Sequence, residues 1–215
     1  MYKYIERGGD IVLSLVFIVL FSPIMLVLAI LVYFDETDSH SVYPLKKDMP
    51  VHIGLKGKPF FMKKFRSMIP NAWEVLQANT ELYEKYRRNN NKLGIDEDPR
   101  ITKIGKFIRA TSIDELPQFF DVLQGNMSIV GPRPYFKFEI DEYWKEHPKT
   151  REDIKKILSV KPGITGEWQV GGRSTISFNQ RIKMDAEYVD RKSFIHDMLI
   201  LLKTPMAIIK KKGVI

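Results

Sequence analysis

The chain has 215 residues, 44% of them hydrophobic, which is enough for one domain with a buried core and excludes a disordered protein. Lysine and arginine outnumber aspartate and glutamate by 34 to 26, a formal charge of +8, so we expect an anionic partner: a phosphorylated substrate, an acidic lipid or a nucleic acid. The absence of cysteine excludes disulfides and thiolate metal sites and suits a reducing, cytoplasm-facing location. The four histidines are scattered and predict no histidine-based metal site.

The first predicted element is an uncharged apolar segment of 24 residues, 11–34. A helix of this length extends about 36 Å, enough to cross a hydrocarbon core of about 30 Å. Its length and the acidic residues that follow it exclude a cleavable signal peptide.

Ser22 and Pro23 lie at the midpoint of this segment. Proline removes one helical hydrogen bond and predicts a bend, and the Ser22 hydroxyl can bond to a backbone group that the bend frees. Two interpretations remain: a kinked spanning helix, or a re-entrant hairpin whose half-helices enter and leave on one face. The flanking charges do not choose between them.

A polar linker, 35–50, precedes a predicted β-hairpin over 51–68 that carries Lys64 and has its turn near Lys56–Pro59. Residues 72–88 have apolar side chains at helical spacing and predict one amphipathic helix. Residues 101–109 predict a short basic amphipathic helix, suited to a membrane surface or to the edge of a phosphate site. A last apolar helical face begins at Phe194 and is expected to stop at Pro205. The predicted fold class is α+β and mostly helical, with amphipathic interfacial helices and a small β-hairpin beside the membrane segment.

Two adjacent carboxylates, Asp114 and Glu115, occupy a predicted helix start within the unusual stretch 109–135. Ser112 lies three residues before Glu115, which is the spacing of a capping box, so plain helix capping explains the pair as well. Alternatively, the helix N-terminus keeps Asp114 ionised as a nucleophile beside a metal-binding Glu115, and attracts phosphate oxygens.

Several cationic and glycine-rich positions indicate a phosphate or sugar site. Arg133 lies between two prolines, which limits the entropy lost when its guanidinium clamps a phosphate. Lys64 offers another cation, and the glycine-rich region 162–173, which ends in Arg173, surrounds Trp168 and Gln169. The ordinary alternatives are a surface turn, a solvated strand face and a loop around a buried tryptophan.

Taken in order, these motifs resemble the bacterial sugar transferase family, the monotopic phosphoglycosyl transferases that start the assembly of polysaccharides and glycoprotein glycans. The likeness covers nearly the whole chain and rests on the Ser-Pro-interrupted membrane segment and on GLKGKPFFMKKFRSM, DPRITKIGKFIRATSIDELPQFFDVLQGNMSIVGPRPY, KPGITGEWQVGGRS, MDAEYV and HDMLILLKT. It implies transfer of a sugar-1-phosphate from a UDP-sugar to a polyprenyl (undecaprenyl) phosphate, releasing UMP, at the cytoplasmic face of the bacterial plasma (inner) membrane.

The resemblance also implies roles for the site residues. Asp114 attacks the β-phosphate to form a covalent sugar-phosphoryl-aspartate, and Glu115 holds Mg²⁺. Arg109 and Arg133 grip phosphates, while Lys64 is structural or supports a phosphate. Gln169 and Arg173 are expected to join them in substrate binding.

By the same resemblance the anchor, 1–34, is a re-entrant hairpin bent at Ser22-Pro23, forming one structural unit with a catalytic region, 35–215. The expected partners are the UDP-sugar, polyprenyl phosphate and membrane phospholipid, and no nucleic-acid motif is present. The rival hypothesis is a non-enzymatic basic membrane module that recruits lipid or partner proteins. It leaves Asp114-Glu115 and the Arg133 motif unexplained. The identity of the sugar, the pathway and the oligomeric state stay open.

Overall fold

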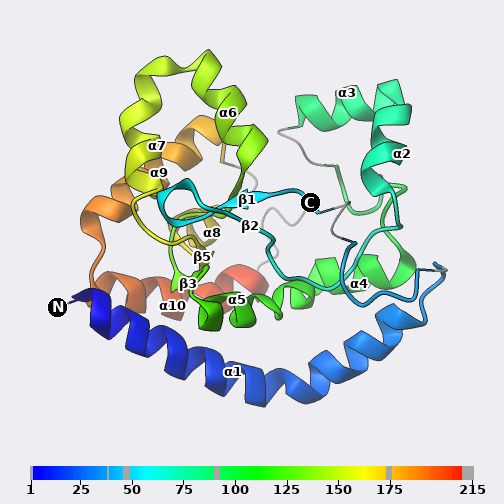
Figure 1. The fold of residues 1–215 in the computed structure, drawn as a ribbon, viewed down its shortest axis with the longest axis horizontal. Coiled ribbons are helices and arrows are strands. Elements are labelled where there is room, and N and C mark those ends of the chain that lie inside the picture. Colours follow the sequence, from blue (N-terminus) through cyan, green and yellow to red (C-terminus); the bar gives the residue numbers. More distant parts are fainter. Residues whose placement is uncertain (1, 38, 46–48, 90–92, 173–175, 210–215) are drawn as a thin grey trace. The chain divides into compact units, whose positions relative to one another are not determined.

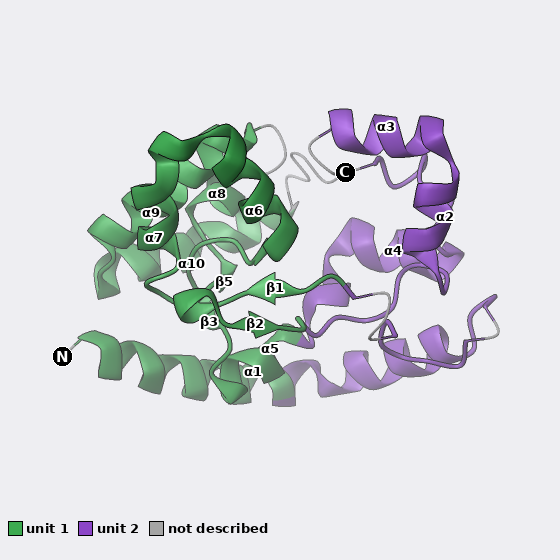
Figure 2. Ribbon diagram, turned by 45° about the horizontal axis from the view of Figure 1, so that its top comes forward, with its two compact units in different colours: residues 1–18, 50–62, 118–213 green, residues 19–49, 63–117, 214–215 purple. Residues whose placement is uncertain are grey.

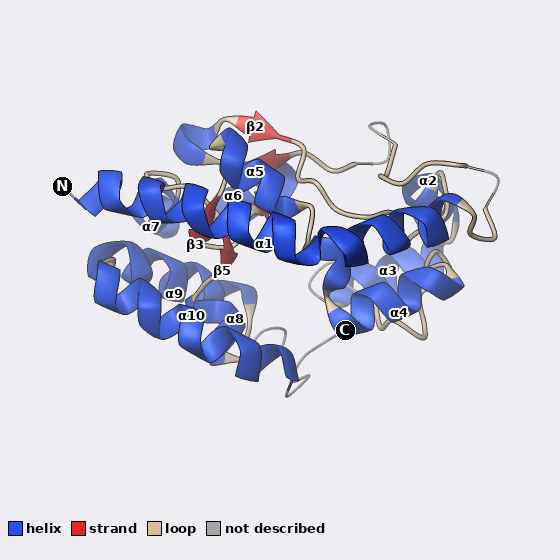
Figure 3. Cartoon of the chain, turned by 90° about the horizontal axis from the view of Figure 1, so that it is seen from below, coloured by secondary structure: helices blue, strands red, loops and turns tan. Residues whose placement is uncertain are grey.

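A computed structural model describes residues 2–37, 39–45, 49–89, 93–172 and 176–209 (Figure 1). Helices dominate these residues and short strands join them, which confirms the predicted mostly helical α+β class (Figure 3). In chain order the elements are α1 (Tyr2–Tyr33), β1 (His52–Ile53), η2 (Leu55–Gly57), β2 (Pro59–Phe60), α2 (Ala72–Ala78), α3 (Thr80–Arg88), α4 (Lys103–Thr111), η3 (Ile113–Glu115), α5 (Gln118–Gln124), β3 (Ser128–Val130), β4 (Tyr135–Phe136), α6 (Lys137–Glu146), η4 (Pro148–Thr150), α7 (Arg151–Ile157), β5 (Gly163–Thr165), α8 (Glu167–Gly171), α9 (Phe178–Arg191) and α10 (Phe194–Ile209).

The chain divides into two compact units, each assembled from separate stretches of sequence (Figure 2). Unit 1 comprises residues 1–18, 50–62 and 118–213, and unit 2 comprises residues 19–49, 63–117 and 214–215. The first half of α1 therefore belongs to unit 1 and the second half to unit 2. This is a division by packing, and the functional division into an anchor, 1–34, and a catalytic region, 35–215, stays a prediction.

Among the described residues, α1 is the one helix that is long and apolar enough to cross a membrane. Only 11% of its most apolar window is buried, so this is not a core helix. The helix continues through Pro23, whose missing N–H leaves the carbonyl of Val19 without its helical donor. Ser22 Oγ donates to that Val19 carbonyl at 2.8 Å, which confirms the expected hydroxyl partner. The re-entrant hairpin itself stays a prediction.

Unit 1 contains two small sheets. In the first, β1 pairs antiparallel with both β2 and β4, with His52 opposite Phe60 and Phe136. The predicted hairpin is confirmed but shorter, because β2 ends at Phe60 and the chain from residue 63 belongs to unit 2. Lys64 consequently lies beyond the hairpin and not on it. In the second sheet, β3 and β5 are parallel. Helices α7 and α9 pack on each other around a core of aliphatic and aromatic residues that includes Ile154 and Ile182.

Two predicted helix boundaries are wrong. The single helix predicted over 72–88 is broken into α2 and α3 at Asn79, whose Oδ1 accepts a hydrogen bond from the Leu82 N–H at 3.0 Å. An asparagine that caps a new helix competes with continuation of the old one. In contrast, α10 continues through Pro205 to Ile209, because proline costs a helix one hydrogen bond and does not forbid its continuation.

Helix α10 carries the apolar face that its sequence predicts, but this face is largely exposed instead of forming a core. The part of α10 that is buried against unit 1 is a narrow stripe that includes Ile200. Such a face suits the predicted interfacial helices. Its exposed large side chains are Phe194, Ile195, Met198, Leu199, Leu202, Met206 and Ile208.

Candidate active site

Helix α4 and the turn that follows it present the two adjacent carboxylates. The helix predicted over 101–109 is confirmed with a shift of two residues, because the Thr102 hydroxyl accepts from the Gly105 N–H at 2.9 Å and caps the start. It ends at Ser112, which adopts a left-handed conformation with φ 57°. Asp114 and Glu115 follow on η3, a single 3-10 turn.

The predicted capping box and α-helix start at this position are wrong. The Ser112 side chain makes no capping hydrogen bond, since its backbone closes α4 and does not adopt the extended conformation of an N-cap. The next α-helix, α5, begins only at Gln118. Helix capping therefore does not account for Asp114 and Glu115.

Asp114 is buried, whereas Glu115 is exposed. The carbonyl of Asp114 accepts a hydrogen bond from the Phe65 N–H at 2.9 Å, which holds the turn against residues 64–67. Burial raises the pKa of Asp114, and the positive charges of Lys64 and then Arg109 oppose this rise. The carboxylate is therefore poorly solvated, and two nearby positive charges favour its ionised form.

Arg109 is held beside Asp114 by the end of α4. Its Nε donates to Ser67 Oγ at 2.9 Å. Burial lowers the pKa of Arg109, and the carboxylates of Asp114 and Asp98 act in the opposite direction. Residues 64–67 approach α4 so closely that a Cβ on Gly105 would lie 2.0 Å from the Ser67 carbonyl oxygen, so this position requires glycine.

A buried ion pair that the sequence did not indicate lies near Arg109. Arg100 donates from Nε and from Nη2 to the two carboxylate oxygens of Asp98, each at 2.7 Å. In the sequence, Asp98 before Pro99 indicates only a break between two elements. The alternation of acid, proline and base in DPR is the available signal, and it is weak.

The four predicted residues Asp114, Glu115, Arg109 and Lys64 all belong to unit 2, and the structure brings them together. Arg133 and Gln169 belong to unit 1. Arg173 lies outside the described residues.

In unit 1, close packing of glycines places the Arg133 motif next to α8. A Cβ on Gly131 would lie 2.7 Å from the Gly163 nitrogen, so the two backbones can meet only as glycines. The Arg133 guanidinium carbon consequently lies 5.6 Å from the Trp168 ring centroid. Gln169 donates to the Ile164 carbonyl at 3.2 Å, while its own side-chain oxygen is buried without a hydrogen-bond partner among the described residues.

Arg181 is a second arginine at this place, which sequence reasoning missed. It is 2% exposed, and its guanidinium carbon lies 4.7 Å from the Trp168 ring centroid. Burial and the neighbouring charge of Arg133 lower the pKa of Arg181 to about 10. In the described part of the chain, Arg181 Nε and Arg133 Nη1 have no hydrogen-bond acceptor. We call these two residues the arginine pair. Largely buried cations with an unused donor are suited to bind an anion.

Asp185 supports the arginine pair from α9. Its Oδ2 accepts from the Arg133 N–H at 3.0 Å and from the Tyr135 hydroxyl at 2.7 Å. Burial raises the pKa of Asp185 to about 6, although both hydrogen bonds and the two arginines oppose the rise. The sequence signal is MDAEYV, which contains Asp185 next to an otherwise ordinary helical pattern.

Glu115 is the predicted Mg²⁺ ligand, and the oxygen donors around it show whether the ion would fit. Among the described residues no three acidic, histidine or cysteine side chains form a metal cluster. Mg²⁺, however, usually keeps several waters and binds through one or two carboxylates together with substrate phosphates. The exposed carboxylate of Glu115 beside buried Asp114 fits that smaller donor set.

The chain is similar to several known proteins. It is 37% identical over 214 residues to an undecaprenyl-phosphate galactose phosphotransferase of Salmonella typhimurium, covering 98% of this chain and 42% of that protein. It is 34% identical to a UDP-N-acetylgalactosamine-undecaprenyl-phosphate N-acetylgalactosaminephosphotransferase of Aeromonas hydrophila, covering 99% and 45%. It is 34% identical to the exopolysaccharide production protein ExoY of Rhizobium meliloti, covering 97% and 87%.

The chain therefore spans less than half the length of the first two of these relatives. The model of one family, bacterial sugar transferase, matches residues 1–211. Because this match includes both compact units and nearly the whole sequence, the chain belongs to the bacterial sugar transferase family.

Proposed function

We propose that the chain transfers a sugar-1-phosphate from a UDP-sugar to a polyprenyl phosphate and releases UMP, as the first membrane step in the assembly of a polysaccharide or other glycan. The observation that carries the proposal is buried Asp114 flanked by the cations Lys64 and Arg109. The relatives named as undecaprenyl-phosphate sugar phosphotransferases support this choice of donor and acceptor.

In the proposed reaction Asp114 is a covalent nucleophile. Its carboxylate forms a bond to the β-phosphorus of the UDP-sugar, and the bond from that phosphorus to UMP breaks. The phosphate of the polyprenyl carrier then attacks the same phosphorus and the carboxylate leaves, which regenerates Asp114 and yields a polyprenyl diphosphate sugar. Lys64 and Arg109 offset the burial of the carboxylate and place fixed positive charge where phosphate charge develops.

Glu115 would hold Mg²⁺ at this site. When bound, the ion supplies positive charge that stabilises the diphosphate and the departing UMP. The arginine pair in unit 1 would bind an anionic part of the donor, with the Trp168 ring as an adjoining flat surface. Gln169 and Arg173 stay expected substrate-binding residues.

The test is UMP release from a panel of UDP-sugars, with and without polyprenyl phosphate. We expect one sugar to be preferred and a stoichiometric release of UMP without the acceptor. Mass spectrometry of that sample should show a sugar-phosphate adduct on Asp114. Membrane binding with no UMP release from any UDP-sugar would favour the non-enzymatic membrane module.

We further propose that α1 is a re-entrant anchor and that the protein lies at the cytoplasmic face of the bacterial plasma membrane. The hydrogen bond from Ser22 to the carbonyl freed by Pro23 supports a stable bend in lipid, where an unpaired backbone group costs several kcal/mol. UDP-sugars are cytoplasmic, so both ends of α1 should lie on that side.

Single cysteines at the exposed positions Lys3 and Lys149 test this topology, because the chain has no cysteine of its own. Both should resist a membrane-impermeant thiol reagent in intact cells and react after lysis. Labelling of Lys3→Cys alone would show that α1 spans the membrane. In the double variant Ser22→Ala, Pro23→Ala we expect partial redistribution to that spanning form, with loss of activity.

A further inference from the structure

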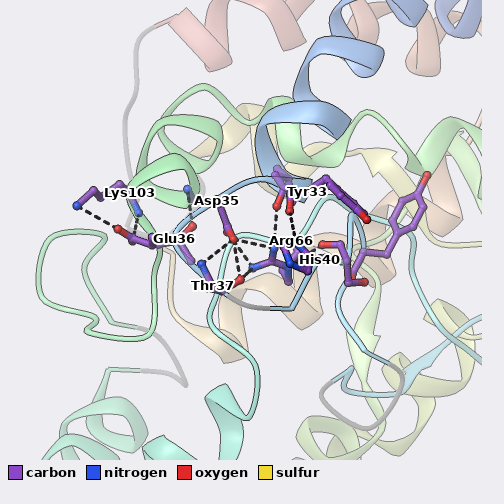
Figure 4. Close-up of polar contacts among 12 residues, drawn as sticks. Tyr33, Asp35, Glu36, Thr37, His40, Arg66 and Lys103 are labelled. Carbon is purple, nitrogen blue, oxygen red and sulfur yellow. Dashed lines mark hydrogen bonds and ion pairs between the residues drawn. The ribbon is translucent and has the colours of Figure 1, made fainter.

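Every N–H donor of the Arg66 guanidinium, in unit 2, makes a hydrogen bond to the segment 32–41. It makes a bidentate pair with Asp35 at 2.8 and 3.0 Å. Its other three hydrogen bonds go to Thr37 Oγ1, the Val32 carbonyl and the Ser41 carbonyl, each at 2.7 Å (Figure 4). The side chains of Arg66 and Asp35 are each 3% exposed. Burial alone would raise the pKa of Asp35, but its hydrogen bonds from Arg66 and Thr37 hold it below the ordinary value. We call this ion pair the Arg66 clamp.

The Arg66 clamp binds the C-terminal end of α1, the membrane helix. Val32 is in the last turn of α1, where carbonyls lack helical donors and a cation is favoured. The side chains of Val32 and Leu28 are buried in a cluster with Phe65, the neighbour of Arg66, and with Ile108 of α4. The end of α1 is thus fastened to unit 2 by charge and by apolar packing.

The same short segment, residues 64–67, also determines the surroundings of Asp114. Lys64 supplies the charge that most opposes the raised pKa of Asp114. The Phe65 N–H donates to the Asp114 carbonyl, and Ser67 Oγ accepts from Arg109. The side chain of Arg66, between these residues, bonds to the end of α1 and to the loop that follows it. One four-residue segment therefore contacts both the nucleophile and the membrane helix.

We propose that Arg66 is a positioning residue, which sets the position of Asp114 relative to the end of the membrane helix and thereby its reach to the lipid-linked phosphate acceptor. This inference rests on the proposed function. A water-soluble donor can enter the site whatever the depth of the catalytic residues relative to the membrane surface. The acceptor phosphate is confined to the membrane surface, so its transfer step depends on that depth. Misplacement by about 1 Å can cost about 100-fold in rate.

A merely structural role makes a different prediction. Loss of a buried ion pair would then lower stability and reduce both half-reactions by the same factor. The two roles separate when UMP release without acceptor is compared with transfer from the loaded enzyme to polyprenyl phosphate.

The chain offers a matched control in the neighbouring pair of Glu36 and Lys103 (Figure 4). Glu36 follows α1 as Asp35 does, and its carboxylate accepts from the Lys103 N–H at 2.9 Å and contacts Lys103 Nζ at 3.2 Å. This exposed pair joins the same loop to α4, and its bonds are to each other and not to residues 64–67. Glu36→Gln should leave both half-reactions within about twofold of the parent, as for exposed ion pairs in general.

The test variants are Arg66→Lys, which keeps the charge but cannot make the bidentate fork, and the milder Asp35→Asn. In the full chain in phospholipid vesicles, we expect UMP release within about threefold of the parent. Transfer to polyprenyl phosphate should fall by about 10- to 100-fold, with a raised KM for that acceptor. A spin label at Phe107→Cys, on the exposed face of α4, should report a changed depth in both variants and an unchanged depth in Glu36→Gln.

Equal losses in the two half-reactions, or none in either, would overturn the proposal. If Arg66→Lys does not fold, Asp35→Asn decides by the same criteria. If the parent turns over but releases no UMP without acceptor, the covalent function fails instead. The label depth then decides alone: a shift in the clamp variants supports the positioning role, and no shift contradicts it.

Discussion

The charged region around Asp114 and the arginine pair differ in how their arginines are satisfied. In unit 2, Arg66 uses all its donors on Asp35 and its neighbours, and Arg100 makes a bidentate pair with Asp98. In unit 1, Arg181 is buried and Arg133 is half-buried against Trp168, and each retains one donor without an acceptor in the described part of the chain, although Arg133 Nη2 also lies 3.6 Å from Glu139 Oε1. Burying a cation without hydrogen bonds is costly. Arginines that hold the fold therefore make bidentate pairs with a carboxylate, while those with an unused buried donor are the better candidates for binding substrate.

The largest effect should follow from Asp114→Asn, which removes the nucleophile and should abolish UMP release by several orders of magnitude. Burial raises the pKa of Asp114, so at neutral pH ionisation of this group disfavours the folded state and the amide should not lower Tm. Asp98→Asn is the contrasting variant: it leaves Arg100 poorly paired and should lower Tm clearly, as loss of one partner of a buried pair costs about 3–5 kcal/mol. Near-normal turnover in Asp114→Asn would falsify the covalent mechanism.

Substitution within the arginine pair should impair binding without harming the fold. In Arg133→Gln and Arg181→Gln we expect KM for the UDP-sugar to rise by about 10- to 100-fold, from about 1.5–3 kcal/mol for a hydrogen bond to a charged group. Thermal unfolding should occur at the parent temperature or above it. Arg100→Gln should have the opposite effects, with a lower Tm and a smaller change in KM. The distinction between the bidentately paired Arg100 and the two arginines with an unused donor fails if both sets of variants lose stability equally.

Glu115→Gln tests the metal at the exposed edge of the Asp114 region. We expect activity to need a higher Mg²⁺ concentration, and EDTA to suppress the parent enzyme. Because Glu115 is exposed and Ser112 makes no capping bond, the fold should tolerate glutamine. Far-UV circular dichroism and a Mg²⁺ titration measure the two effects. Full activity of the parent in EDTA would remove the metal from the reaction.

The smallest effect should be a shift in pH dependence. Lys64 lowers the pKa of Asp114, so Lys64→Met should raise that pKa further. Since the nucleophile acts in its ionised form, the acidic limb of the kcat/KM profile should move to higher pH. As pH rises, the loss of activity should shrink to the constant deficit left by the missing positive charge of Lys64 at the developing phosphate charge. Lys63→Met is the matched control, and an unmoved limb in Lys64→Met would show that this limb does not report Asp114.

Local features of the fold were predictable because their causes lie within a few residues. The carbonyl freed by Pro23 is four residues back, within reach of the Ser22 hydroxyl, and the β1–β2 turn is marked by glycine and proline. At two of the places where local reasoning was wrong, Asn79 and Ser112, two local preferences competed. Asn79 capped a new helix, and Ser112 closed an old one in a left-handed conformation.

By itself, the sequence determined the apolar 24-residue segment, the Asp114-Glu115 pair and the order of motifs that marks the family. It could not single out Arg66 or Arg181 among 34 lysines and arginines. Arg66 pairs with Asp35, which is 31 positions away in the sequence, and Arg181 contacts Trp168 of another helix. Whether a charge is buried, paired or left with unused donors depends on which distant segments pack around it, and only the tertiary structure decides that.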